Sequence, residues 1–185
     1  MVAIRKQFAV ISFQIADNIM TFQETINLVK QIPYGRNSNR ENFSLVISEN
    51  KGTCSSKHAY LKDYADKNNI PNVKLFIGIY KMNEQNTKIG NILTENNIDY
   101  IPEAHCYLKI DGKTVDLTTN ESDFNKIKSY LLEEIEIEPF QVADFKVDYH
   151  QKFIKDWLSE SNSKFTFDEI WEIREKCIQQ LSINI

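Results

Sequence analysis

A histidine and an aspartate at hairpin spacing are the first residues in this sequence whose types and positions suit proton transfer. His105 lies in a run with a strand pattern, Ala104–Ile110, and Asp116 lies in the next such run, Lys113–Thr118. The dipeptide Asp111-Gly112 between the runs is typical of a two-residue hairpin turn. The sequence therefore predicts a hairpin that carries both side chains.

The register of this hairpin follows from its turn. A two-residue loop pairs Leu108 with Val115, which gives one apolar face, whereas a three-residue loop would mix the two faces. Asp116 then lies across from Tyr107, with His105 as its diagonal neighbour. Diagonal positions are about 7–8 Å apart at the backbone, a gap that an imidazole and a carboxylate can bridge. The carboxylate would orient the ring and stabilise its cation, which makes the histidine a general base. The predicted polar face carries His105, Tyr107, Lys109, Thr114, Asp116 and Thr118, and the other face carries Cys106, Leu108, Ile110, Lys113, Val115 and Leu117.

Cys54 is the nucleophile that such a base would need. It follows Gly52-Thr53, a natural helix entry, and precedes a segment that favours a helix to about Asn68. Free N–H groups and the positive end of the helix dipole stabilise a thiolate at such a position. The backbone N–H at the helix start could also donate to an oxyanion on the attacked carbonyl.

These motifs resemble a known group of enzymes. The segments Lys51–His58, Pro102–Leu108 and Val115–Thr118 resemble those of the transglutaminase-like superfamily of papain-like thiol enzymes, in which a Cys at a helix start meets a His and an Asp from successive strands. The resemblance spans Gly52–Thr118, about a third of the chain. It implies Cys54 as nucleophile, His105 as general base and acid, and Asp116 as the orienting carboxylate.

The resemblance also bears on the rest of the site. Members often take a second oxyanion donor from a side chain upstream of the cysteine, for which Tyr34 and Asn37 are the candidates here. Nothing in the sequence resembles the calcium-binding segments of animal transglutaminases. No metal and no cofactor are therefore expected.

Other interpretations of the same residues stay open. A zinc site could combine Cys54, His105 and Asp116, although no closely spaced ligand pair anchors it. His58 shares a helix face with Cys54, but we expect it to pack or to hydrogen-bond in the wall of the site. The remaining candidates are interpreted as structural: Cys106 and Cys177 as core residues, and His150 as a structural or exposed side chain.

The elements that must position these residues include both helices and strands. Before Cys54 we expect a strand near Phe8–Ile15, a helix opened by the capping box Thr21–Glu24, a loop over Tyr34–Asn42, and a strand or helical turn over Phe43–Ile47. The next expected elements are a strand buried on both faces over Val73–Tyr80 and a short helix or loop over Thr87–Asn97. In the last third we expect helices over Asp123–Glu134, Asp148–Leu158 and beyond the capping box Thr166–Glu169. The acidic run Glu133–Glu138 alternates with isoleucine and is expected to be a solvated strand or helix end.

Fold class and domain organisation follow from these elements. We expect α+β architecture of the papain and transglutaminase type, in which the nucleophile helix packs on a small antiparallel sheet and helices follow. The length of 185 residues suits one domain over 1–185. Its core would span about 20–120 and a helical C-terminal extension about 121–185.

Composition narrows the partners and the compartment. The 22 basic and 26 acidic side chains give a formal charge of -4, which argues against nucleic acid as a partner. No segment suggests a signal peptide or a bilayer-crossing helix, so no membrane partner is expected. Three cysteines without paired spacing fit a reducing compartment, and we expect a cytoplasmic protein. The oligomeric state stays open.

We therefore expect a cysteine-dependent acyl-transfer enzyme acting on a peptide or on a small amide or acyl substrate through a thioester. A cysteine protease or amidohydrolase is preferred over a transglutaminase, because water as acceptor needs no second binding site. The alternatives are a non-catalytic module that binds a peptide or partner in the same cleft, and a small-acyl transferase.

Overall fold

A four-stranded antiparallel sheet forms the centre of the fold. The computed structural model describes residues 20–184, so the strand expected near Phe8–Ile15 lies outside the described residues. The strand order is β3-β2-β1-β4, and the strands are β1 (Val73–Met82), β2 (Ile101–Ile110), β3 (Lys113–Val115) and β4 (Leu131–Ile137). Helices accompany this sheet, so the expected α+β class is confirmed.

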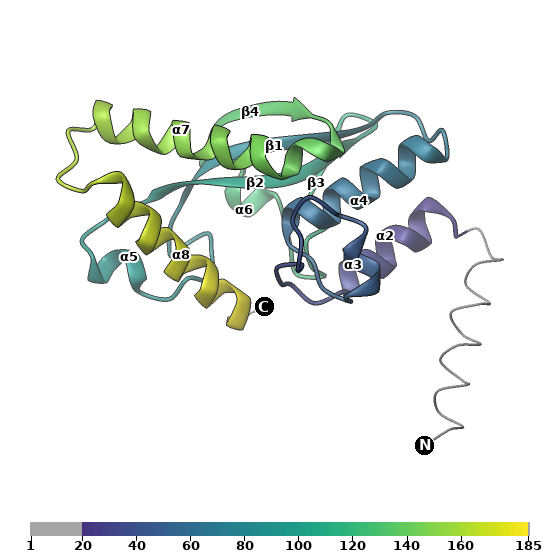
Figure 1. The fold of residues 1–185 in the computed structure, drawn as a ribbon, viewed down its shortest axis with the longest axis horizontal. Helices are drawn as coiled ribbons and strands as arrows, with labels where there is room; N and C mark the ends of the chain where they lie inside the picture. Colours follow the sequence, from purple (N-terminus) through teal and green to yellow (C-terminus); the bar gives the residue numbers. More distant parts are fainter. Residues whose placement is uncertain (1–19, 185) are drawn as a thin grey trace, which may run out of the picture.

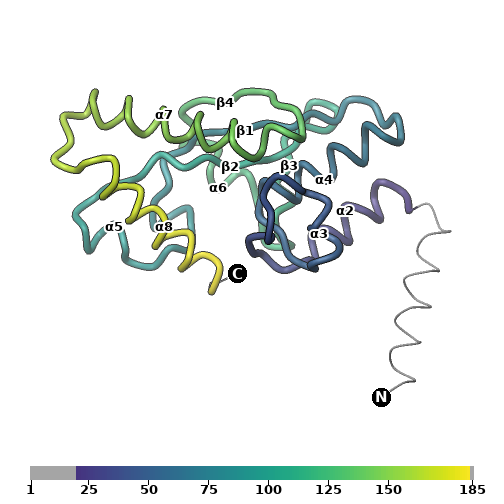
Figure 2. The backbone as a smooth tube through the Cα atoms, viewed as in Figure 1, coloured from purple at the N-terminus to yellow at the C-terminus, as the bar shows by residue number. Residues whose placement is uncertain are grey.

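The helices lie on both sides of the sheet. They are α2 (Phe22–Gln31), α3 (Leu45–Ser48), α4 (Cys54–Lys67), α5 (Ile92–Glu95), α6 (Asn125–Lys128), the 3-10 helix η1 (Pro139–Val142), α7 (Asp144–Glu160) and α8 (Phe167–Asn184). Figure 1 shows α7 across the near face of the sheet and α6 behind it. Figure 2 follows the chain from α7 back through α8, whose last turn points toward the group formed by α2, α3 and α4. None of the described helices has the length and apolar character needed to span a bilayer.

The main core lies between the sheet and helix α4. Leu75 and Ile77 of β1 and Leu108 of β2 are fully buried against this helix, which contributes Leu61 and Ala65. Val142 of η1 and side chains of α7 complete the same cluster. Apolar residues at every second position of β1 therefore hold the sheet against the helix that begins at Cys54.

The predicted hairpin register is confirmed. Leu108 pairs with Val115, and Ile110 pairs with Lys113. Asp111 and Gly112 have φ angles of 49° and 76°, the left-handed values that a two-residue turn requires. The short turn therefore places His105 and Asp116 as the sequence predicts.

Strand β3 ends at Val115 and not at Thr118, because side chains take the hydrogen bonds that the ladder would need. The N–H of Leu117 donates to His58 Nε2 at 2.8 Å, and the N–H of Thr118 donates to Asp116 Oδ1 at 3.0 Å. Within the described residues, the part of β2 around His105 therefore has no hydrogen-bonded strand on the side where β3 lies.

The C-terminal third differs from its prediction. The helix expected over Asp123–Glu134 is wrong: a single turn, α6, is followed by β4, which pairs with β1. Alternation of Ile135 and Ile137 with glutamates gives the strand a buried and an exposed face, and pairing with β1 outweighs the helical spacing. The segment after residue 121 is therefore not purely helical.

The remaining helix predictions mostly hold. The capping box at Thr21 is present, and Thr166 and Glu169 bond reciprocally at the start of α8. Of the strand and the helical turn expected over Phe43–Ile47, the structure has the helical turn, α3. Helix α7 begins at Asp144, earlier than expected.

Candidate active site

Cys54 is the first residue of helix α4. The cap residue Thr53 and Ser56 form a capping box, in which the N–H of Thr53 donates to Ser56 Oγ at 3.0 Å. Within residues 20–184, the N–H groups of Cys54 and Ser55 have no hydrogen-bond acceptor. The helix start therefore presents free donors beside a thiol that is 8% exposed.

His105 and Asp116 form the predicted pair. The distance between His105 Nε2 and Asp116 Oδ2 is 2.9 Å, and both side chains are largely buried. The second carboxylate oxygen accepts from the N–H and the hydroxyl of Thr118, at 3.0 and 2.6 Å. Burial alone would raise the pKa of Asp116, but His105 and these hydrogen bonds hold it well below its usual range.

The Cys54 thiol and the His105 ring also interact. Burial lowers the pKa of His105, but the Asp116 carboxylate and the Cys54 sulfur outweigh burial and raise the pKa to about 10. The pKa of Cys54 lies well below its usual value because of a hydrogen bond from the Cys106 thiol, the Lys146 charge and His105. Because Nε2 of His105 is engaged by Asp116, Nδ1 is the nitrogen left for the sulfur. The structure thus brings all three predicted site residues together, with the pKa of the thiol lowered and that of the imidazole raised.

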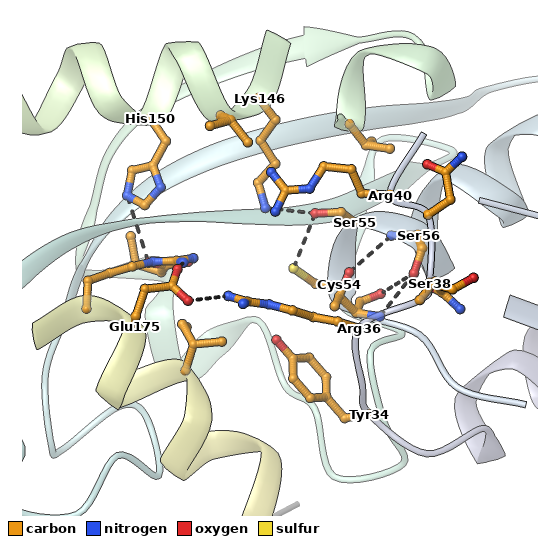
Figure 3. A pocket seen from close by; sticks show the side chains of 18 of the residues that line it. Tyr34, Arg36, Ser38, Arg40, Cys54, Ser55, Ser56, Lys146, His150 and Glu175 are labelled. Carbon is orange, nitrogen blue, oxygen red and sulfur yellow. Dashed lines mark hydrogen bonds and ion pairs between the residues drawn. The ribbon is translucent and has the colours of Figure 1, made fainter. Parts of the chain in front are cut away.

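A second set of contacts reaches the start of helix α4 from helix α7 (Figure 3). Lys146 of α7 donates from Nζ to Ser55 Oγ at 2.8 Å. That oxygen lies 3.9 Å from Cys54 Sγ and 3.6 Å from Cys106 Sγ. Cys106 is buried in the core, as expected, and its thiol also contributes to the low pKa of Cys54. The sequence indicates neither this role nor that of Lys146.

His58 has the wall position expected for it. Its Nε2 accepts from the N–H of Leu117, so Nδ1 carries the proton and donates to the Cys54 carbonyl at 2.7 Å. Burial lowers the pKa of His58, which keeps the ring neutral. With both nitrogens engaged, His58 positions the segment around Asp116 and is not a rival base.

A lysine that the sequence does not single out joins two segments of the site. Lys57 is fully buried in α4, and its ammonium group donates to the carbonyls of Ile32 and Thr118. Burial lowers the pKa of Lys57 to about 8. The side chain therefore ties the residues before Tyr34 to the residues after Asp116.

Replacing Lys57 should destabilise the protein. In Lys57→Met two carbonyl groups lose their buried donor, so we expect the free energy of unfolding to fall by about 1–3 kcal/mol. Urea denaturation at neutral pH measures the change. Lys67→Met at the exposed end of the same helix is the control and should change stability by less than about 0.5 kcal/mol. Equal unfolding midpoints for the two variants would contradict this role.

Gly78 leaves space for the ring of Tyr107, which lies beside His105. It pairs with His105 across β1 and β2, and a Cβ there would lie 2.8 Å from Tyr107 Cε1 and 2.7 Å from Leu131 Cδ1. The Tyr107 ring centroid lies 6.4 Å from that of His105. The absence of a side chain at Gly78 therefore lets Tyr107 pack closely and hold the sheet face that carries His105.

Cys54 lies between two cavities, of about 460 and 140 Å³. Tyr34 lines both, and a bridge to Gly52 holds it next to the helix start. Figure 3 shows its ring directed toward Cys54. Asn37, the other candidate donor, uses its amide nitrogen on Glu49 and on the Lys51 carbonyl. The geometry therefore favours Tyr34.

The remaining sequence candidates have structural positions. His150 is buried, with Nε2 placed 2.8 Å from the Pro102 carbonyl oxygen. Cys177 is buried in the α8 core, as expected, and the three cysteines are free thiols. Within the described residues, no group of three His, Cys, Asp or Glu side chains is arranged to hold a metal ion. The zinc interpretation therefore gains no support there.

Comparison with models of known protein families, with curated proteins and with solved structures found no match to this chain.

Proposed function

We propose that this chain is a cysteine-dependent acyl-transfer enzyme that cleaves amide or peptide bonds through a thioester on Cys54. One observation carries the proposal: a thiol of low pKa at a helix start meets a histidine of raised pKa that is bonded to Asp116 at 2.9 Å. Perturbed pKa values in a cleft are typical of functional groups. The helix start against an antiparallel sheet also supports a fold of the papain and transglutaminase type, and the free thiols suit the cytoplasm.

In the first half-reaction, the Cys54 thiolate attacks the carbonyl carbon and forms the carbon–sulfur bond. The carbonyl oxygen becomes an oxyanion, for which the Cys54 N–H and the Tyr34 hydroxyl are the proposed donors. His105 then gives its proton to the leaving nitrogen as the carbon–nitrogen bond breaks. The amine departs, and the acyl group stays on the sulfur.

In the second half-reaction, water attacks the thioester. The neutral His105 takes a proton from the water as the carbon–oxygen bond forms, and Asp116 stabilises the resulting imidazolium. The carbon–sulfur bond breaks, the carboxylic acid leaves and the thiolate returns. We prefer water to an amine as the acceptor because it requires no second binding site.

Intact-mass spectrometry tests the proposal. After incubation with a mixed pool of peptides and small amides, the protein should carry an acyl adduct on Cys54, and Cys54→Ser should carry none. Cys177→Ala is the control, since that thiol lies in the α8 core. Adducts that survive Cys54→Ser would show that the nucleophile is misassigned. A protein that forms no adduct with any member of the pool, and whose Cys54 alkylates only near pH ~8.5, would be a binding module.

Tyr34→Phe should slow amide cleavage and leave thiol reactivity unchanged. Loss of one of two oxyanion donors is expected to lower kcat about 10²- to 10³-fold with little change in KM. Alkylation of Cys54 by iodoacetamide forms no oxyanion, so its rate should stay within about twofold of the wild-type rate. Steady-state kinetics measures kcat and KM, and the rate of alkylation measures the reactivity of the thiol. Equal losses in both would contradict an oxyanion role and indicate a structural one.

A further inference from the structure

The larger cavity beside Cys54 carries unpaired positive charge. Its wall includes four cationic side chains, two carboxylates and the start of helix α4. The cationic residues are Arg36, Arg40, Lys146 and Arg174, and the acidic residues are Glu103 and Glu175. His150 adds no charge at neutral pH, because burial lowers its pKa.

Two of the four cations are engaged by the carboxylates. Arg174 binds both oxygens of Glu103, at 2.6 and 2.7 Å, and it binds Glu175 at 2.6 Å. Arg36 contacts the other oxygen of Glu175 at 2.7 Å (Figure 3). These contacts form a closed network at the α8 side of the cavity and leave neither carboxylate free.

Arg40 and Lys146 have no such partners. Arg40 makes no ion pair or hydrogen bond with any residue in 20–184, and Lys146 bonds only to the Ser55 hydroxyl in that range. Figure 3 shows both side chains on the α7 side of the cavity, whose wall also includes Cys54. When the Cys54 thiolate is counted with the two glutamates, the wall retains one positive charge. Acylation removes the charge of the thiolate and so frees Lys146 for an anion on the acyl group.

We propose that this cavity binds an acyl group that carries a carboxylate, so that the substrate is an acidic peptide or a dicarboxylic acyl amide. The proposal rests on the function proposed above. Before acylation this surplus of one charge matches the single charge of an incoming carboxylate, and after acylation the surplus of two leaves both Arg40 and Lys146 to donate to it. The volume of about 460 Å³ suits an amino-acid-sized acyl chain.

A matched pair of activated esters tests this proposal. The probes are the mono-4-nitrophenyl ester of glutaric acid and the same ester in which the free carboxylate is a primary amide. Cys54 would displace 4-nitrophenolate from either, so nitrophenolate release and intact mass give the acylation rate. At low salt we expect the carboxylate ester to react about tenfold faster, and this ratio should fall as salt is raised to about 0.5 M.

The variants separate charge recognition from thiol reactivity. Lys146→Met slows both esters because it also raises the thiol pKa, whereas the ratio of the two rates isolates recognition of the carboxylate. Arg40→Gln and Lys146→Met should each lower the ratio about threefold or more. Lys67→Gln, at the other end of α4, should leave it unchanged.

Each outcome bears on one proposal. Equal rates for the two esters on Cys54 would overturn the acidic substrate and leave the acyl-transfer function standing. Failure of both esters to acylate Cys54 would count against the function itself. A faster reaction with a phosphonate ester of the same length would overturn the carboxylate assignment in favour of a doubly charged anion.

Discussion

His105→Ala should reduce thioester formation on Cys54 at pH 7 by about 10³-fold or more. The variant loses the cation beside the sulfur and the proton donor for the leaving nitrogen. Alkylation should fall less, by roughly 10- to 100-fold at pH 6, because the Cys106 thiol and Lys146 still lower the thiol pKa. Quenched time courses of thioester formation measure the first effect, and iodoacetamide labelling across pH 5–9 measures the second.

Added imidazole provides the control for this variant. The side chain of His105 is 15% exposed and lines the smaller cavity, so its removal leaves a space that a free imidazole can enter. Imidazole should partly restore acylation without changing the thermal stability of the variant. This result would show that the lost side chain transfers the proton. Acylation at the wild-type rate without imidazole would remove His105 from the mechanism.

The sequence predicts the local parts of this site because each depends on near neighbours. The Asp111-Gly112 turn permits one register, and that register determines which face carries His105. In the same way, the hydroxyl of Thr53 caps α4, which places Cys54 at the helix start. Turn and cap chemistry act over two to four residues, so they can be recognised without coordinates.

The contacts that the sequence does not predict join distant segments. Lys146 reaches Ser55 across 91 positions, and the Leu117 N–H that ends β3 bonds to His58 across 59. The helix predicted over Asp123–Glu134 is wrong for a related reason. The run after Asp123 fits both the helical and the strand period, and only pairing of β4 with β1 decides between them. Long-range packing leaves no mark in the spacing of either partner.

Asp116→Asn should lower amide cleavage at pH 7 by about 10²-fold or more while keeping the local structure. The amide oxygen can still accept from the N–H and hydroxyl of Thr118, so the bend after β3 persists. What disappears is the charge that raises the His105 pKa to about 10. In the pH profile of kcat/KM, the decrease on the alkaline side should therefore occur at least one pH unit lower than in the wild type.

The same substitution has a consequence for stability that needs no substrate. The folded-state pKa of His105, about 10, lies above its unfolded value of ~6.5, so its stabilisation is complete below pH ~6.5 and disappears as the pH rises through 10. In urea denaturation, the free energy of unfolding of the wild type should therefore exceed that of Asp116→Asn most clearly at pH 5–6. The difference between the two should narrow toward pH 10. Thr114→Val in β3 is the control, because its effect should not vary with pH. A constant difference for Asp116→Asn would mean that the carboxylate does not hold a charged His105, and the thiolate would then lack the acid that the proposed reaction requires.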